Sequence, residues 1–170
     1  MIRKTTLVLT LMASTSVHSF AASITLDHYG TFDNITIAGR IEPGDYQKFT
    51  QIAQSLKGPV RVSLASLGGS FDDGINIGEV IHASRWDTEV IDGWDCVSSC
   101  ANIWLAGRHR TITGQSQVAF HAPYALEDPQ HADGAASAMF GVYLAHLGYS
   151  YGDVTKLMGH SPKEYRSFFA

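Results

Sequence analysis

The chain has 170 residues, a length that suits one domain with a single hydrophobic core. It is 45% hydrophobic and 16% charged, a composition that excludes a disordered chain. The net charge of −4 argues against nucleic acid as a partner, because phosphate binding needs clustered Lys and Arg. The only basic cluster, residues 108–110, is too short for that purpose.

The N-terminal segment has the pattern of a secretory signal peptide. Two basic residues precede an apolar run at residues 5–17 that is too short to span a bilayer, and small residues follow at Ser19 and Ala21, as signal peptidase requires. We predict a signal peptide at residues 1–21, a mature domain at residues 22–170 and export to the periplasm. The alternative is an N-terminal helix of a cytosolic protein. Cleavage removes two bases and no acid, so the net charge becomes −6. No later segment is expected to span a membrane.

Strands and helices are predicted to alternate along the mature chain. Strands are expected at residues 35–38, 60–64, 88–91 and 118–120, where short apolar or β-branched runs end at Gly, Pro or polar residues. Helices are expected at residues 43–56, 71–81, 100–106, 135–147 and 151–158. The Ser161-Pro162 pair resembles a helix cap, so a last helix is expected to run into the C-terminus. This order predicts an α/β fold with a mostly parallel sheet and crossover helices.

A serine-containing turn lies between the third predicted strand and the following buried helix, in the segment Cys96-Val97-Ser98-Ser99-Cys100. A serine near a helix N-terminus lies where unpaired amides favour developing negative charge, as a nucleophile requires. The alternative is that Ser98 or Ser99 only caps the helix.

A glycine-rich loop follows the second predicted strand, at residues 66–74. Its glycines would let backbone amides approach a ligand closely. A phosphate loop is disfavoured, because no Lys follows the glycines and the three spaced glycines of dinucleotide sites are absent. A turn without a function is the alternative.

One histidine, His121, follows an apolar strand and precedes a loop that contains Pro123. It can project into a site from there, although a lone histidine in such a position is more often structural. No two histidines have metal-binding spacing, and no metal or cofactor is expected.

The chain has two cysteines, Cys96 and Cys100. In an oxidising compartment they could form a disulfide if their Cα atoms come within about 7 Å. Two buried hydrophobic side chains are the alternative. Thiol redox chemistry is disfavoured, because three residues rather than two separate the cysteines.

These segments together resemble the proteolytic subunit of Clp protease. The resemblance consists of Gly-Gly-Ser, a serine on a strand-to-helix turn, Leu-Ala-Gly nine residues later, an Arg and His-x-Pro, in this order. It spans roughly residues 35–123. The Cys-x-Ser-x-Cys setting is similar to exported Clp-like proteins of Gram-negative bacteria. The sequence departs from the family at residues 95–97, where the family favours Gly and Ala.

The resemblance implies a ClpP/crotonase-like spiral of repeated β-β-α units and a serine peptidase or related hydrolase. It assigns Ser98 as nucleophile, His121 as general base, and the amides of Gly69 and Ser99 as the oxyanion hole. It also implies a peptide or acyl substrate and a homo-oligomer. An ATPase partner is not expected, because the periplasm lacks ATP.

The family's third catalytic residue, an Asp, has no clear counterpart. Its position falls close to Ser161, which is no carboxylate; Asp153 and Glu164 lie near that position, and Asp128 lies closer to His121 in the sequence. The final predicted helix stops early, as in a C-terminally truncated domain. A non-catalytic assembly or binding module is therefore the main alternative to an enzyme. A crotonase-type acyl-CoA site is disfavoured, because acyl-CoA is cytosolic.

Overall fold

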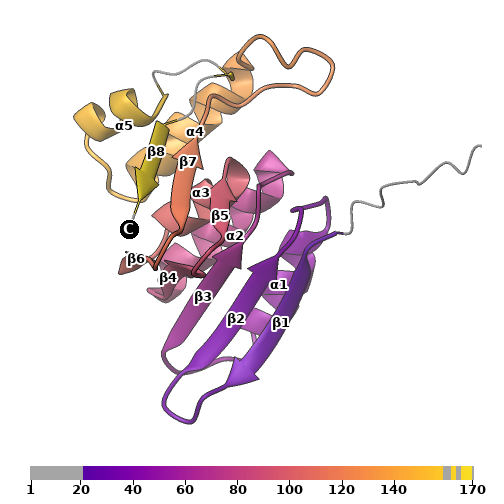
Figure 1. The fold of residues 1–170 in the computed structure, drawn as a ribbon, viewed down its shortest axis with the longest axis vertical. Coiled ribbons are helices and arrows are strands. Elements are labelled where there is room, and N and C mark those ends of the chain that lie inside the picture. The colour runs from indigo at the N-terminus through magenta and orange to yellow at the C-terminus, as the bar shows by residue number, and fades with distance from the viewer. Residues whose placement is uncertain (1–20, 159–161, 164–165, 170) are drawn as a thin grey trace, which may run out of the picture.

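The computed structural model describes residues 21–158, 162–163 and 166–169, which form a mixed α/β fold (Figure 1). The predicted signal peptide lies outside the described residues, apart from Ala21. None of the described helices is both long and apolar enough to cross a membrane.

The strands form two sheets. The larger has the order β1-β2-β3-β4-β6, namely β1 (Ser23–His28), β2 (Asp33–Ala38), β3 (Val60–Ala65), β4 (Asp87–Val90) and β6 (Arg110–Ile112). The smaller has the order β5-β7-β8, namely β5 (Asp95–Val97), β7 (Gln117–Phe120) and β8 (Arg166–Phe169). β1 and β8 are antiparallel edge strands, and the other neighbours pair in parallel. Both sheets are thus mixed, so a mostly parallel spiral is not confirmed.

The described helices are α1 (Asp45–Ala53), α2 (Phe71–Ser84), α3 (Ser99–Leu105), α4 (Gly134–His146) and α5 (Tyr151–Met158). Figure 1 shows α1 and α2 behind the larger sheet. Helix α3 contacts strands of both sheets, so it connects the two halves of the core.

The core lies between the larger sheet and these helices. Ile35 and Ile37 lie two positions apart in β2, with Thr36 between them. Both are fully buried, as are Val62 and Leu64 of β3. This alternation follows from the two-residue period of a strand. Burial of each such side chain contributes about 1.5–3 kcal/mol, which makes this layer the main stabilising contact of the fold.

Most predicted elements overlap an observed one, and the described residues contain four further strands, β1, β5, β6 and β8. β1, β5 and β6 were not predicted; β5 and β6 have only three residues each, and β1 is largely exposed. The predicted C-terminal helix is wrong, because residues 166–169 form β8, which pairs with β7. A four-residue helix cannot offset its nucleation cost, whereas the edge of β7 offers ready backbone partners.

One buried carboxylate, that of Asp73, holds the start of α1 against the start of α2. Its Oδ1 accepts hydrogen bonds from the amides of Gly44 at 3.1 Å and Tyr46 at 2.9 Å. Its Oδ2 accepts the Ser70 hydroxyl at 2.7 Å, and the residue is 8% exposed. Asp73 thus stabilises both helix starts and the end of the glycine loop.

Asp73→Ala is expected to lower the free energy of unfolding by about 2–3 kcal/mol, because it leaves buried donors without an acceptor. Urea unfolding of the purified protein measures the change. Asp72→Ala is the matched control: Asp72 is an exposed acid in the same helical turn, and its loss should cost less than about 1 kcal/mol. Equal losses in the two variants would contradict this role of Asp73.

Candidate active site

Ser98 occupies the turn between β5 and α3 in a backbone conformation that is rare for a residue with a side chain. Its φ is +60° and its ψ is −124°. Such a conformation costs on the order of 1–3 kcal/mol and persists only where neighbours impose it. The Ser98 amide donates to the Ala119 carbonyl at 2.9 Å, and the Val97 amide donates to the Ser66 carbonyl at 3.0 Å. The turn is therefore fixed from both sides.

His121 lies immediately after β7, the strand next to β5. The parallel pairing matches Val97 with Ala119, so both strands deliver their next residues to the same edge. Ligand sites in α/β proteins commonly lie beyond the carboxyl ends of parallel strands. This register is the physical reason that Ser98 and His121 lie at the same edge, although 23 positions separate them in the sequence.

The His121 ring has a backbone partner. Its Nδ1 lies 2.8 Å from the Ala122 carbonyl oxygen. In the tautomer with a proton on Nδ1, the ring donates to this carbonyl and Nε2 remains an acceptor. The Tyr124 ring lies 5.4 Å from the His121 ring, centroid to centroid.

A cavity of about 390 Å³ joins the residues that the sequence singled out. Ser98, His121 and Gly69 all line it. The remaining lining residues come from the segment before α1, the glycine loop and the start of α2, β5, the loop after β7 and α4: Arg40, Glu42, Pro43, Leu67, Ser70, Phe71, Val97, Pro123, Tyr124, Leu126 and Ala136. Arg40 and Glu42 form an ion pair at 2.9 Å, so the two charges in this wall compensate each other.

The glycine loop lies directly against the serine turn. A Cβ on Gly68 would be 2.6 Å from the Val97 carbonyl oxygen and 2.8 Å from the Ser98 Cβ. A Cβ on Gly69 would lie only 2.0 Å from the Ile41 carbonyl oxygen. The loop can therefore approach this closely only with glycine at both positions.

Hydrogen bonds fix the orientation of this loop. The Gly68 amide donates to the Ser66 hydroxyl at 3.0 Å, and the Ser70 amide donates to the Ile41 carbonyl at 2.8 Å. Among the described residues, no partner for the intervening Gly69 amide is found. This amide is thus available to a ligand in the cavity.

Ser99 differs from its neighbour. It is 1% exposed and does not line the cavity, and its hydroxyl has no hydrogen-bond partner within the described part of the chain. The side chain packs against α2, where a Cβ on Gly74 would lie 2.8 Å from the Ser99 Cβ. The Ser99 hydroxyl therefore points away from the site, and only the backbone of this residue adjoins Ser98.

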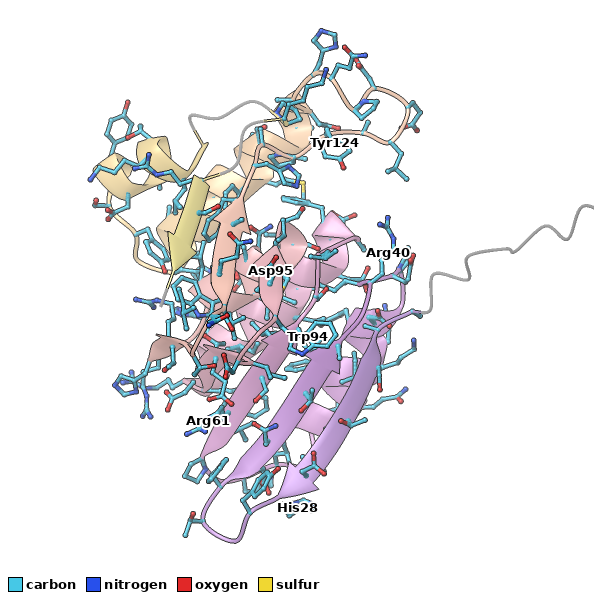
Figure 2. The ribbon with its side chains drawn as sticks, in the orientation of Figure 1. His28, Arg40, Arg61, Trp94, Asp95 and Tyr124 are labelled. Carbon is cyan, nitrogen blue, oxygen red and sulfur yellow. A yellow bond between two sulfur atoms is a disulfide. The ribbon has the colours of Figure 1, made fainter. Side chains whose placement is uncertain are left out.

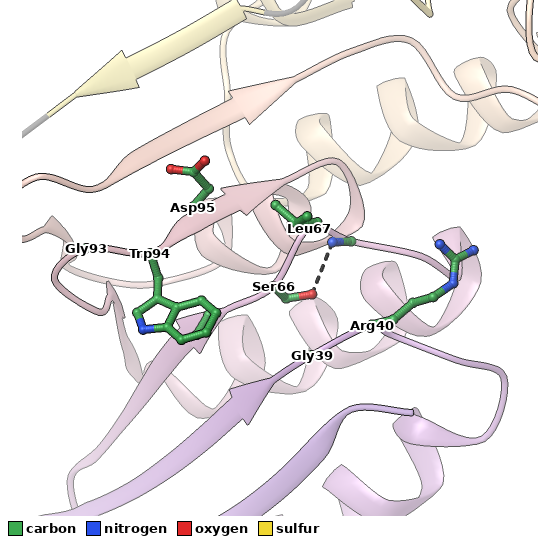
Figure 3. A pocket seen from close by; sticks show the side chains of 9 residues that line it. Gly39, Arg40, Ser66, Leu67, Gly93, Trp94 and Asp95 are labelled. Atoms are coloured by element: carbon green, nitrogen blue, oxygen red, sulfur yellow. Dashed lines mark hydrogen bonds between the residues drawn. The ribbon is translucent and has the colours of Figure 1, made fainter. Parts of the chain in front are cut away.

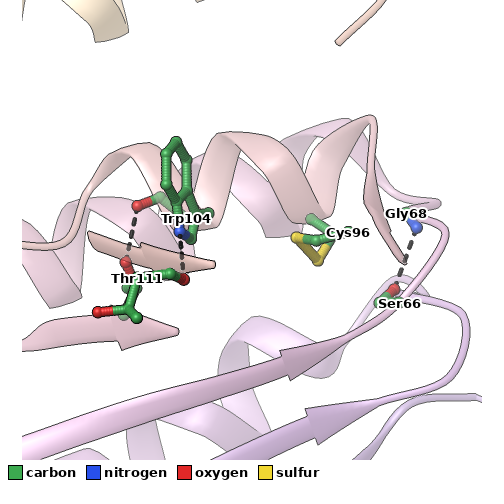
Figure 4. The surroundings of a disulfide bond; sticks show 7 residues. Ser66, Gly68, Cys96, Trp104 and Thr111 are labelled. Carbon is green, nitrogen blue, oxygen red and sulfur yellow. Dashed lines mark hydrogen bonds between the residues drawn. A yellow bond between two sulfur atoms is a disulfide. The ribbon is translucent and has the colours of Figure 1, made fainter. Parts of the chain in front are cut away.

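A disulfide joins Cys96 of β5 to Cys100 of α3, on either side of Ser98 (Figure 4). The two Cα atoms are 5.2 Å apart, and both residues are fully buried. The bond ties the last strand residues before the serine turn to the first turn of the helix after it. It therefore restrains the backbone of Ser98 in addition to the hydrogen bonds above.

A second cavity, of about 500 Å³, is lined by the start of the glycine loop and by residues 93–95 (Figure 3). Leu67 and Arg40 line both cavities. Trp94 and Leu67 are 56% and 72% exposed, so both present apolar surface at this cavity. Figure 2 shows Trp94 in front of the larger sheet, on the face opposite α1 and α2. The two cavities therefore share part of their walls.

The position of a third catalytic residue remains a prediction. Ser161 and Glu164 lie outside the described residues. Asp128 is bound to His131 at 2.9 Å on an exposed loop. The Asp153 carboxylate accepts the amide and hydroxyl of Ser150, which lowers its pKa, and it lines a different cavity. The described residues also contain no cluster of three or more His, Cys, Asp or Glu side chains that could hold a metal ion.

Several lining residues could not be found from the sequence. Arg40, Tyr124 and Leu126 belong to loops, and no spacing pattern marks them as part of a site. The bonds from Ser66 and Ala119 to the serine turn also depend on backbone groups, which have no signal in residue type. Strand pairing alone brings these groups together.

Comparison with known proteins identifies the fold. No protein-family model matches the sequence, and no curated protein is similar to it. By structure, 407 chains of solved structures match, so the architecture is a recurrent one. One of these is a ClpP1 mutant from Listeria monocytogenes, with a TM-score of 0.59 and 16% sequence identity. The superposition covers 81% of this chain and 82% of that one. The protein therefore has a ClpP-like fold.

The disulfide predicts that iodoacetamide modifies neither cysteine in denatured, unreduced protein and both after reduction. The double variant Cys96→Ala/Cys100→Ala should have a free energy of unfolding about 2 kcal/mol lower than wild type. The reason is that the loop of residues 96–100 is no longer closed in the unfolded chain, which therefore gains conformational entropy. Mass spectrometry and urea unfolding measure the two effects. Two free thiols in protein isolated without reductant would contradict the bond.

Gly69→Ala is expected to destabilise the protein by about 3 kcal/mol or more, because the new Cβ collides with the Ile41 backbone. Gly93→Ala is the control: Gly93 also has a positive φ, +76°, but no atom lies within 4 Å of a Cβ there. Its cost should be limited to about 1–2 kcal/mol of backbone strain. Thermal unfolding of both variants tests the difference, and a Gly69→Ala variant as stable as Gly93→Ala would refute the close approach.

Proposed function

We propose that the protein is an exported serine hydrolase, a Clp-like serine peptidase or a related acyl hydrolase. Ser98 is the nucleophile and His121 is the general base. The observation that carries the proposal is the cavity of about 390 Å³ that Ser98, His121 and Gly69 line together. These three positions follow three different strands, and each belongs to a segment that resembles the Clp protease family in sequence.

The reaction begins with attack of the Ser98 Oγ on a carbonyl carbon, while the Nε2 of His121 takes the hydroxyl proton. The protonated ring then gives this proton to the leaving group, and water releases the acyl group from Ser98 by the same steps. The Ala122 carbonyl, 2.8 Å from the His121 Nδ1, supports this assignment, because it favours the tautomer with an accepting Nε2. A backbone carbonyl then contributes to the orienting role that an Asp has in a triad.

The oxyanion that forms on the substrate would be bound by the amides of Gly69 and Ser99. The Gly69 amide borders the cavity between two anchored neighbours, and the Ser99 amide begins α3, where helical amides lack an internal acceptor. Loss of one such donor lowers the rate on the order of 10²–10³-fold. The constrained glycine loop is therefore as important to the proposal as the base.

The two adjoining cavities favour a long substrate that crosses the glycine loop. Leu67 and Arg40 line both cavities, and Trp94, Tyr124 and Leu126 supply exposed apolar surface along them. An extended peptide or an acyl chain would bury this surface. The compensated Arg40–Glu42 pair gives no preference for a charged substrate.

The proposal includes the periplasm as the compartment and a homo-oligomer as the assembly. The signal-peptide pattern and the buried disulfide both support an oxidising compartment. The ClpP-like fold supports an oligomer and the spiral arrangement of β-β-α units. Without periplasmic ATP, no ATPase partner is part of the proposal.

A non-catalytic binding module on the same fold is the second candidate. It is favoured by the engagement of Asp128 and Asp153 in contacts away from His121. The same cavities would then hold a ligand without turning it over.

A fluorophosphonate probe distinguishes the two candidates. It is expected to label the purified wild-type protein, to leave Ser98→Ala unlabelled and to react at least about tenfold more slowly with His121→Ala, because general-base catalysis contributes about 10²–10⁴-fold. His131→Ala is the matched control, since His131 lies on an exposed loop and outside the cavity. Intact mass spectrometry gives the labelled fraction over time.

Three outcomes would count against the proposal. Labelling that persists in Ser98→Ala and disappears in Ser99→Ala would move the nucleophile by one residue. Equal labelling of His121→Ala and wild type would remove the base. A folded wild-type protein that never reacts would favour the binding module.

A further inference from the structure

A third cavity, of about 410 Å³, lies on the other side of β7 from Ser98. It is formed by α3, β6, β7, α5 and β8, and shares no lining residue with the two cavities around the glycine loop. Its volume is within the range of about 300–1,000 Å³ that is common for small-molecule sites. The proposed hydrolase does not use it.

The cavity has an apolar floor and a cationic rim. Leu105, Phe120 and Leu157 form the floor and are each less than 8% exposed. The rim contains Arg110, Arg166, Lys156 and a single acid, Asp153. An excess of positive charge at this place is notable in a chain with a net charge of −4.

The two arginines of the rim lack the carboxylate partner that three other arginines have among the described residues. Arg40, Arg61 and Arg108 each form an ion pair with a carboxylate. Among the residues that the structure describes, no carboxylate lies within ion-pair distance of Arg110 or Arg166. The acid of this rim is engaged elsewhere, since Asp153 accepts two hydrogen bonds from Ser150.

The Arg110 side chain is held in place before any ligand binds. Its Nη1 donates to the Gly107 carbonyl at 2.7 Å, and its guanidinium lies 5.9 Å from the Trp104 ring centroid and 5.8 Å from that of Tyr149. Both rings are themselves fixed. The Trp104 Nε1 donates to the Thr111 carbonyl at 3.2 Å, and the Tyr149 hydroxyl donates to the Leu105 carbonyl at 3.0 Å.

A guanidinium has five N–H donors, and a carboxylate or phosphate can accept two of them side by side. The bond to Gly107 uses one. We infer that this cavity binds a small amphiphilic anion, with its acyl or alkyl chain on the floor of Leu105, Phe120 and Leu157 and its anionic group at Arg110 and Arg166. An uncharged alkyl ligand would offer no anion to the arginines of the rim, and a cationic ligand would be repelled by them. The inference is independent of catalysis at Ser98.

Trp104 provides the readout. In a Trp94→Phe background, the remaining tryptophans are Trp104 in the cavity and Trp86, which is buried in the core. Titration with octanoate is expected to change the fluorescence in a saturable manner. 1-Octanol and octylammonium should bind at least about tenfold more weakly, because a charge-assisted bidentate contact is lost. Octyl phosphate is titrated in the same way. A higher affinity for octyl phosphate than for octanoate would indicate a phosphate-bearing lipid, and a lower affinity would indicate a free acid.

Arg110→Leu should weaken octanoate binding at least about tenfold, whereas its effect on 1-octanol should be within about twofold. Arg108→Leu is the matched control, since Arg108 lies two positions away, pairs with Asp87 and does not line the cavity. Circular dichroism checks the fold, and Arg166→Leu serves as the second variant if Arg110→Leu fails to fold.

Equal affinity for octanoate and 1-octanol would overturn the inference. So would unchanged octanoate binding in folded Arg110→Leu or Arg166→Leu, or the absence of saturable binding by any of the anions.

Discussion

The parallel pairing of β5 with β7 is the contact on which the rest of the site depends. It places Ser98 and His121 at one edge and supplies the Ala119 carbonyl that holds the Ser98 amide. The positive φ of Ser98 is sustained by this bond, by the Ser66 carbonyl and by the disulfide on either side of the turn. Without the pairing, the serine would relax to an ordinary helix cap.

The glycine loop is the second constraint, and it connects the site to the body of the fold. Gly68 lies against the Ser98 turn, Gly69 lies against Ile41, and Ser70 is bound to the buried Asp73 carboxylate. Because Asp73 also holds the start of α1, any shift of that helix would be transmitted to the loop. The geometry of the proposed oxyanion position at Gly69 therefore depends on contacts well outside the cavity.

β7 separates two different chemical environments. Successive side chains of a strand point to opposite faces, so His121 lines the cavity of Ser98, whereas Phe120 forms part of the floor beneath Arg110. The antiparallel strand β8 completes the second environment, since it places Arg166 opposite Phe120. The two cavities thus use successive residues at the end of β7 without sharing a residue.

The sequence by itself determined the alternation of strands and helices, the choice of Ser98, His121 and Gly69, and the cysteines beside the serine. The alternation follows from residue type and local periodicity, whereas the choice of Ser98, His121 and Gly69 follows from the resemblance to the proteolytic subunit of Clp protease. Only the tertiary structure decided the mixed sheets, the strand at residues 166–169, the direction of the Ser99 hydroxyl and the cavities with Arg40, Trp94 and Arg110 in their walls. Strand order and edge pairing are long-range contacts between backbone groups, and backbone groups are the same in every residue.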